Sequence, residues 1–209
     1  MEKKEQAYAY ANADFSNSNE LFLEKLFEFC SITDETEILD VGCGDGEIPI
    51  EIYRKTKSKI TVLDGSSAML DEFSKKMCAN NIDDIKIIQR RYEDTRFMEK
   101  SFDILISNSV LHHVKSPKLF WEKSFNLVRQ HGHIVLMDLF RPSNEHELLS
   151  VLDKYGGNNP VLLNDFENSL RAAYTLNEVE GQLSSFSNIS SSVKAISDRH
   201  FFVTIEIKE

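Results

Sequence analysis

A glycine-rich turn between an apolar run and an amphipathic segment most constrains how this chain can fold. Residues 38–46 read Ile-Leu-Asp-Val-Gly-Cys-Gly-Asp-Gly, with a glycine at every second position after the apolar run. This order predicts a buried strand, a tight turn, and a helix that begins beneath a bound ligand. Glu47 stands where the dinucleotide-binding pattern GxGxxG has its third glycine, which falls here at Gly46. The spacing therefore argues against a dinucleotide.

Strand-like and helix-like segments alternate along the middle of the chain. Ser66 is a candidate N-cap, and Ser116-Pro117 is a cap followed by proline at the first helical position. Such alternation predicts a parallel sheet with helices on both faces. We expect strands near 38–42, 59–64, 84–89, 102–107 and 132–138, and helices near 46–56, 67–80 and 117–130.

The pattern changes after Pro142. Residues 145–155 and 163–174 have helical patterns, and the Thr175–Glu178 capping box predicts the start of another helix. The serine-rich stretch 184–192 is expected to be a loop. Two final strands, near 193–197 and 201–207, would form a closing hairpin.

Four motifs in this order resemble those of the class I S-adenosylmethionine (SAM)-dependent methyltransferases. They are Asp40–Gly44, Ile60–Ser66, Phe102–His113 and Leu127–Asp138. The resemblance covers roughly residues 34–140, and segments 6–15, 138–142 and 197–200 are similar to a bacterial small-molecule-type subgroup without a defined substrate. It implies a doubly wound α/β fold with a seven-stranded, mostly parallel sheet and an antiparallel last strand. SAM would be the cofactor and S-adenosylhomocysteine (SAH) its product.

The resemblance also implies which residues bind the cofactor. Asp64 would accept bonds from both ribose hydroxyls, because a carboxylate is acceptor-only, and Asp40 would lie near the cationic amino group. Arg91 stands where many relatives place an acid that binds adenine, so a backbone contact from Arg91 or Tyr92, or stacking of Arg91, would serve instead. Glu93 or Asp94 would take this role if the register is shifted. Met69 is equally consistent with a core residue. The full set is Asp40, Gly42, Cys43, Gly44, Asp64, Gly65, Ser66, Met69, Arg91, Tyr92, Asn108 and Ser109.

His112, His113 and Asp138 are the candidate catalytic residues. A histidine at the end of the fourth strand could take a proton from a nucleophile, since its ordinary pKa is near ~6.5. Either histidine could instead cap or pack locally, and methyl transfer can proceed by positioning and exclusion of water alone. Asp138 and Arg141 could face the substrate crevice or form an ion pair with each other. Candidate substrate-binding residues are Tyr8, Phe15, His112 and Arg141.

Charge and cysteine content narrow the choice of partner. The 209-residue chain has a formal net charge of −10 and a pI of about 5.1, which argues against nucleic acid. Its three cysteines lack metal-ligand spacing, so we expect no metal and a reducing, cytoplasmic location. No stretch resembles a membrane span or a signal peptide. We expect a monomer or a homodimer.

These features divide the chain into two parts. Residues 1–33 would form an N-terminal helical lid, with an amphipathic helix over 20–30. Residues 34–209 would form the methyltransferase domain, with the helical insertion 142–185 shaping the substrate pocket.

The expected activity is methyl transfer from SAM to an O, N, S or C nucleophile of a small molecule. Alternatives are a SAM- or SAH-binding regulatory or accessory protein without methyl transfer, and a protein methyltransferase.

Overall fold

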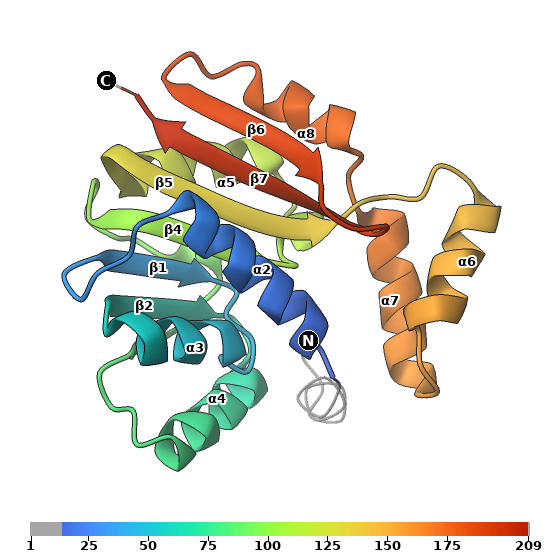
Figure 1. Cartoon of the computed structure of the whole chain (residues 1–209). Coiled ribbons are helices and arrows are strands. Elements are labelled where there is room, and N and C mark those ends of the chain that lie inside the picture. Colours follow the sequence, from blue (N-terminus) through green and yellow to red (C-terminus); the bar gives the residue numbers. More distant parts are fainter. Residues whose placement is uncertain (1–13, 209) are drawn as a thin grey trace.

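Seven strands form one sheet at the centre of the computed structural model, which describes residues 14–208. Their order in the sheet is β3-β2-β1-β4-β5-β7-β6. Strands β1 to β5 pair in parallel, whereas β7 runs antiparallel to both β5 and β6. This confirms the doubly wound sheet with an antiparallel last strand (Figure 1). The strands are β1 Glu37–Val41, β2 Lys59–Asp64, β3 Lys86–Gln89, β4 Phe102–Asn108, β5 Val128–Leu139, β6 Ile189–Ala195 and β7 His200–Ile207.

Helices cover both faces of the sheet. α2, α3 and α4 pack on one face and α5 and α8 on the other, while α6 and α7 stand beside the sheet beyond the end of β5 (Figure 1). Among residues 14–208, no helix combines the length and the apolar character needed to cross a membrane. The helices are α2 Ser16–Phe29, α3 Glu47–Thr56, α4 Ser67–Ala79, α5 Pro117–Leu127, α6 Glu145–Tyr155, α7 Pro160–Ala172 and α8 Leu176–Leu183, with short 3₁₀ helices η1 Tyr92–Asp94 and η2 Leu111–His113.

Two hydrophobic clusters, one on each face, hold these layers together. Along β5, Ile134 and Leu136 contribute to the cluster beneath α5 and α8, and Val135 and Met137 to the cluster beneath α2, α3 and α4. Each side chain therefore points to the face opposite its neighbour's. Because both faces are covered, the central strands are continuously apolar rather than alternating.

The described part of the expected N-terminal lid is α2, and it belongs to the core. Phe22 and Leu26 of α2 are fully buried, and the Phe22 ring packs edge-on against Phe202 of β7 with 6.1 Å between centroids. The preceding residues 1–13, which include Tyr8, lie outside the described residues.

Several predicted boundaries are wrong, among them the starts of α2, at Ser16 rather than residue 20, and of β5, at Val128 rather than residue 132. α5 ends at Leu127 rather than residue 130, because the chain enters β5 there and β5 pairs with β4. α7 begins at Pro160 rather than 163, since Asn159 caps it. β6 begins at Ile189, within the expected serine loop, because main-chain pairing with β7 overrides the weak strand preference of serine.

Candidate active site

Side chains from two other parts of the chain pack closely against the glycine turn after β1. Gly42, Gly44 and Gly46 all have positive φ, at 78°, 56° and 81°. A Cβ on Gly42 would lie 2.3 Å from the Val110 side chain, and one on Gly46 would lie 2.0 Å from the ring of Phe73 on α4. Gly46 thus permits close helix packing, a role that the sequence pattern alone did not assign, and neither Val110 nor Phe73 had any local signal.

Asp64, at the end of β2, holds the turn in place. Its carboxylate accepts hydrogen bonds from the backbone N–H of Gly44 at 3.0 Å and of Ser66 at 2.7 Å. One bond reaches each oxygen, and a carboxylate oxygen has two lone pairs. Both oxygens of Asp64 therefore retain capacity for a further donor.

Asp40 lies in β1 directly before the turn and is 4% exposed. Its burial, with a smaller contribution from the negative charge of Asp64, raises its pKa to about 8. Burial also raises the pKa of the neighbouring Cys43 thiol. This end of the turn therefore favours a cationic group, which would stabilise the ionised form of Asp40.

Most residues expected on the adenine side gather at the turn. The Met69 methyl lies 3.4 Å from where a Cβ on Gly44 would be, and Arg91 Cγ lies 3.2 Å from the corresponding point on Gly65. Tyr92 differs, since its ring is buried beneath α5 and its hydroxyl lies 2.9 Å from Ser124 Oγ. Only the backbone of Tyr92 is thus left to contact a ligand.

His112, on η2 after β4, forms a buried pair with Asp138 at the end of β5. Nδ1 of His112 lies 2.6 Å from the Asp138 carboxylate, which also accepts from the backbone N–H of His112 and of Leu139. The His112 and Asp138 side chains are 3% and 1% exposed. A carboxylate at Nδ1 favours the tautomer with its proton there, which leaves Nε2 as an acceptor. Nε2 is buried without a hydrogen-bond partner among the described residues.

The neighbours of this pair have distinct environments. The His113 ring centroid lies 3.9 Å from that of His112. Desolvation at this position, together with the charge of His112, lowers the His113 pKa to about 4. Ser109 has a positive φ of 57°, and its hydroxyl lies 3.4 Å from Asn108 Oδ1. Such strain at the end of a strand is typical of functional sites.

Arg141 does not pair with Asp138, so that alternative is wrong. Its guanidinium donates to Glu178 at 2.6 Å and to the carbonyl of Ala173 at 3.2 Å.

Phe15 directly precedes α2 and is 37% exposed. Within residues 14–208, no group of three or more His, Cys, Asp or Glu residues is arranged to hold a metal ion.

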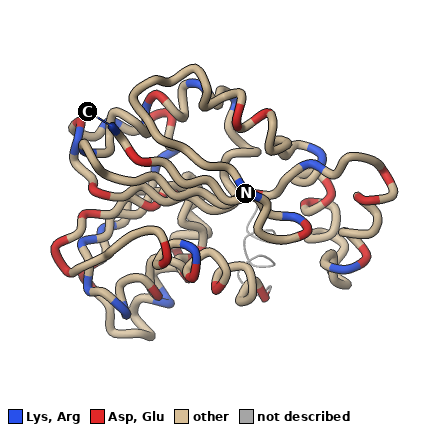
Figure 2. The backbone as a smooth tube through the Cα atoms, turned by 45° about the horizontal axis from the view of Figure 1, so that its top comes forward, with Lys and Arg blue, Asp and Glu red and all other residues tan. Residues whose placement is uncertain are grey.

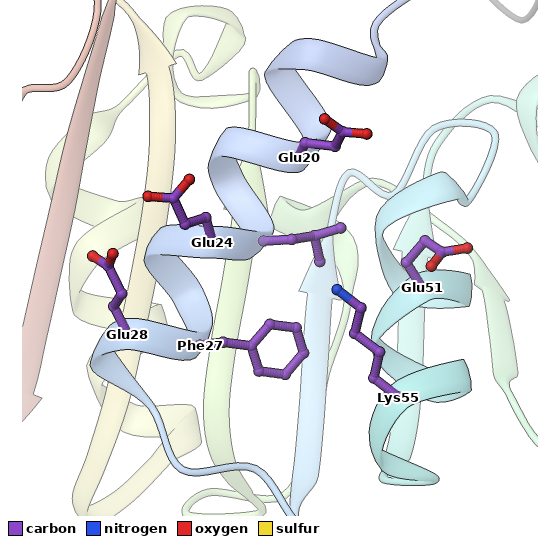
Figure 3. Close-up of a pocket in the computed structure, with 7 residues that line it drawn as sticks. Glu20, Glu24, Phe27, Glu28, Glu51 and Lys55 are labelled. Atoms are coloured by element: carbon purple, nitrogen blue, oxygen red, sulfur yellow. The ribbon is translucent and has the colours of Figure 1, made fainter.

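A separate groove lies between α2 and α3 (Figure 3). It encloses about 670 Å³ and contains none of the predicted site residues. Phe27 and the aliphatic chain of Lys55 face each other across it, with the Lys55 ammonium 5.3 Å from the ring centroid. Its lining residues are Glu20, Leu23, Glu24, Phe27, Glu28, Glu51 and Lys55.

Comparison with known proteins places this arrangement in context. Residues 39–136 match a family model described as a methyltransferase domain. The chain is 28% identical over 126 residues to the ribosomal RNA small subunit methyltransferase C of Marinomonas sp., and 26% identical over 119 residues to the ubiquinone biosynthesis O-methyltransferase of Neisseria meningitidis serogroup C. These matches cover 58% and 56% of this chain, but only 35% and 50% of the two relatives.

The fold is also similar to a solved structure. The plantazolicin methyltransferase BamL, in complex with a triazolic desmethylPZN analog and SAH, superposes with a TM-score of 0.80 at 14% sequence identity. The superposition covers 98% of this chain and 90% of that protein. At this identity the likeness establishes a shared fold.

Proposed function

Because the chain belongs to the class I SAM-dependent methyltransferase superfamily, we propose that it transfers the methyl group of SAM to an O, N, S or C nucleophile of a small molecule. One observation supports this most strongly. Asp64 fastens the glycine turn through Gly44 and keeps free lone pairs, while the buried Asp40 lies in β1 just before that turn. The two carboxylates thus suit a ligand with hydroxyl donors at one end and a cation at the other.

The residues of the turn fit SAM. Asp64 would receive the ribose hydroxyls, Asp40 would lie near the amino group, and Gly42 and Gly44 would allow close backbone approach. Gly65, Ser66, Met69 and the backbone of Arg91 and Tyr92 would surround the adenine, with Cys43, Asn108 and Ser109 completing the site. When bound, SAM supplies an electrophilic methyl group attached to a positively charged sulfur.

His112 supplies the proposed general base. Asp138 orients the ring through Nδ1, so that Nε2 can accept a proton from the acceptor atom. Asp138 also stabilises the imidazolium that results. His113 remains neutral near pH 7 because its pKa is lowered, so it would not repel that charge. In this proposal Arg141, Phe15 and Tyr8 contribute to the substrate side.

A small-molecule acceptor is favoured over nucleic acid by charge. The net charge is −10, and along the described backbone the Lys and Arg positions are interspersed with Asp and Glu positions (Figure 2). Nucleic-acid binding depends on clustered cations. The relatives nevertheless include an RNA methyltransferase, and an acidic surface would attract a basic protein substrate.

Titration calorimetry with SAH tests the proposed cofactor site. Asp64→Ala should weaken binding by about 5- to 150-fold, the equivalent of the ~1–3 kcal/mol cost of an unpaired buried polar group. Asp71→Ala, on the exposed side of α4, is the matched control and should bind as the parent does. No binding of SAM or SAH to the parent at millimolar concentration would refute the proposal.

A second measurement separates an enzyme from an accessory protein that only holds SAM. Methyl-labelled SAM would be incubated with the protein and the small-molecule fraction of a cell extract. The proposal predicts SAH formation and a labelled product with the parent, and neither with His112→Ala, which should still bind SAH. Tight SAM binding without turnover would favour the accessory role.

A further inference from the structure

The segment that contains α6 and α7 lies against η2, the 3₁₀ helix that carries the proposed base. Within residues 14–208, His112 Nε2 is the buried side-chain polar atom without a hydrogen-bond partner, and α7 packs against η2, which carries His112. A buried acceptor without a donor is destabilising by about 1–3 kcal/mol. A base sealed from solvent is also sealed from any methyl acceptor. Whatever covers Nε2 must therefore move before His112 can act, and α7 is a helix that packs on η2.

Few apolar contacts attach α6 and α7 to the sheet. Leu148 is the buried residue of α6 and Leu170 that of α7. They pack with Leu139 and Ala173, and with the partly buried Val151, Leu152 and Phe166, in a small cluster distinct from the two that cover the sheet. Segments with so little buried apolar surface open at low free energy.

The two ends of the segment are fastened side by side. Phe140 and Tyr174 form an isolated parallel bridge, and the Arg141 N–H donates to the carbonyl of Tyr174 at 3.2 Å. The ion pair between Arg141 and Glu178 lies at the same place. A segment that leaves and returns at one point can swing without disturbing β5 or α8.

The end of α6 is held to the turn before β7 by polar groups, of which Lys154 and Asp198 are exposed and Tyr155 and Arg199 are partly buried. The Lys154 ammonium lies 2.7 Å from the Asp198 carboxylate, and the Tyr155 hydroxyl donates to the same carboxylate at 2.8 Å. The Arg199 guanidinium lies 3.5 Å from the centroid of the Tyr155 ring. Exposed ion pairs contribute roughly 0–1 kcal/mol each, so these contacts can hold the segment yet release it.

We propose that residues 142–173 form a lid over His112, and that Lys154, Tyr155, Asp198 and Arg199 are its latch. Opening of the latch admits the methyl acceptor to Nε2, and closure then excludes water from the site. The role of this lid in methyl transfer rests on the proposed function of His112 as a general base. Its existence can be tested without SAM or a substrate.

Diethyl pyrocarbonate, which acylates accessible unprotonated imidazole nitrogens, provides that test. Peptide mass spectrometry would compare the modification rate of His112 with that of the exposed His146 in the same sample. We expect His112 in the parent to react at least about tenfold more slowly than His146. The double variant Tyr155→Ala/Asp198→Ala should raise the His112 rate about tenfold, which corresponds to about 1.4 kcal/mol of lost closure.

Two further variants control for loss of structure. Tyr155→Phe removes the hydroxyl contacts but keeps the ring beneath Arg199, so it should produce a smaller increase with an unchanged melting temperature. Glu72→Ala breaks an exposed ion pair with Lys75 on α4 and should leave the His112 rate unchanged. An unchanged His112 rate in both latch variants, or a parent in which His112 reacts as fast as His146, would overturn the lid. Failure of the parent to bind SAH would refute the proposed function, but it would not change what the acylation rates of His112 show about the lid.

Discussion

Asp40 binds its proton unusually tightly for a carboxyl group, because it is buried beside a second carboxylate. Its pKa of about 8 means that it is largely neutral at pH 7 in the free protein. A cation bound nearby favours the ionised form and lowers that pKa. We therefore predict that SAM binding releases a proton from Asp40, and that SAM affinity rises with pH up to about 8 and then levels off.

Calorimetry in two buffers with different ionisation enthalpies measures this proton directly. At pH 7 the observed heat of SAM binding should differ between the buffers for the parent, whereas for Asp40→Asn it should not. Asp71→Asn, an exposed carboxylate on α4, should behave as the parent. A buffer-independent heat for the parent would show that Asp40 keeps its proton or has already lost it.

The sequence predicted the positions of Asp40 and Asp64 because each lies within or directly after an apolar strand segment. It could not predict the partner of His112, since Asp138 is 26 residues away and reaches it only because β4 and β5 are adjacent. The ion-pair partner of Arg141 could not be predicted for the same reason, since Glu178 lies 37 residues further along the chain. Long-range side-chain pairing is a property of the topology, and local spacing does not encode it.

At the scale of elements, Gly46 ends the glycine turn, caps the start of α3 and lies against Phe73 of α4. Alanine there would have to adopt a φ of 81° and would place its Cβ 2.0 Å from the Phe73 ring. The left-handed backbone is unfavourable by about 1–2 kcal/mol, and overpacking by about a further 1–3 kcal/mol. We predict that Gly46→Ala lowers the free energy of unfolding by about 2–5 kcal/mol, measured by urea denaturation.

Gly157 offers a matched control, because it shares the positive φ but has open space around it. Its φ is 62°, and no atom lies within 4 Å of the position of an added Cβ. Gly157→Ala should therefore show only the backbone contribution of about 1–2 kcal/mol. Equal destabilisation by the two substitutions would mean that α4 yields to the extra methyl group.

The order of the central elements followed from their apolar periodicity, but several of their ends did not. Gly132 illustrates why: its environment leaves no room for a Cβ, which would lie 2.6 Å from the carbonyl oxygen of Asp103. The neighbouring His131 has a positive φ of 59°, and the pairing of β5 with β4 shifts register between Phe102 and Ile104. This irregularity depends on the neighbouring strand β4, so no pattern within residues 117–138 could predict it.

At the scale of the whole molecule, α2 belongs to the same folding unit as the sheet. A boundary at residue 33 would separate Phe22 and Leu26, both fully buried, from the cluster that they share with Ile38 and Ile52. A chain that begins at Asp34 should therefore expose one face of its sheet, bind a hydrophobic dye and lose its near-ultraviolet circular dichroism.

Point substitutions in α2 test this dependence without removing the helix. Phe22→Ala leaves a cavity in the core and should lower the free energy of unfolding by about 3–5 kcal/mol. Phe29→Ala, where 38% of the side chain is already exposed at the end of the same helix, should cost much less. Urea denaturation should remain a single transition in both variants, since α2 and the sheet share one core. Comparable small losses in the two variants, or cooperative unfolding of the chain that begins at Asp34, would instead make α2 a separable cover on a complete domain.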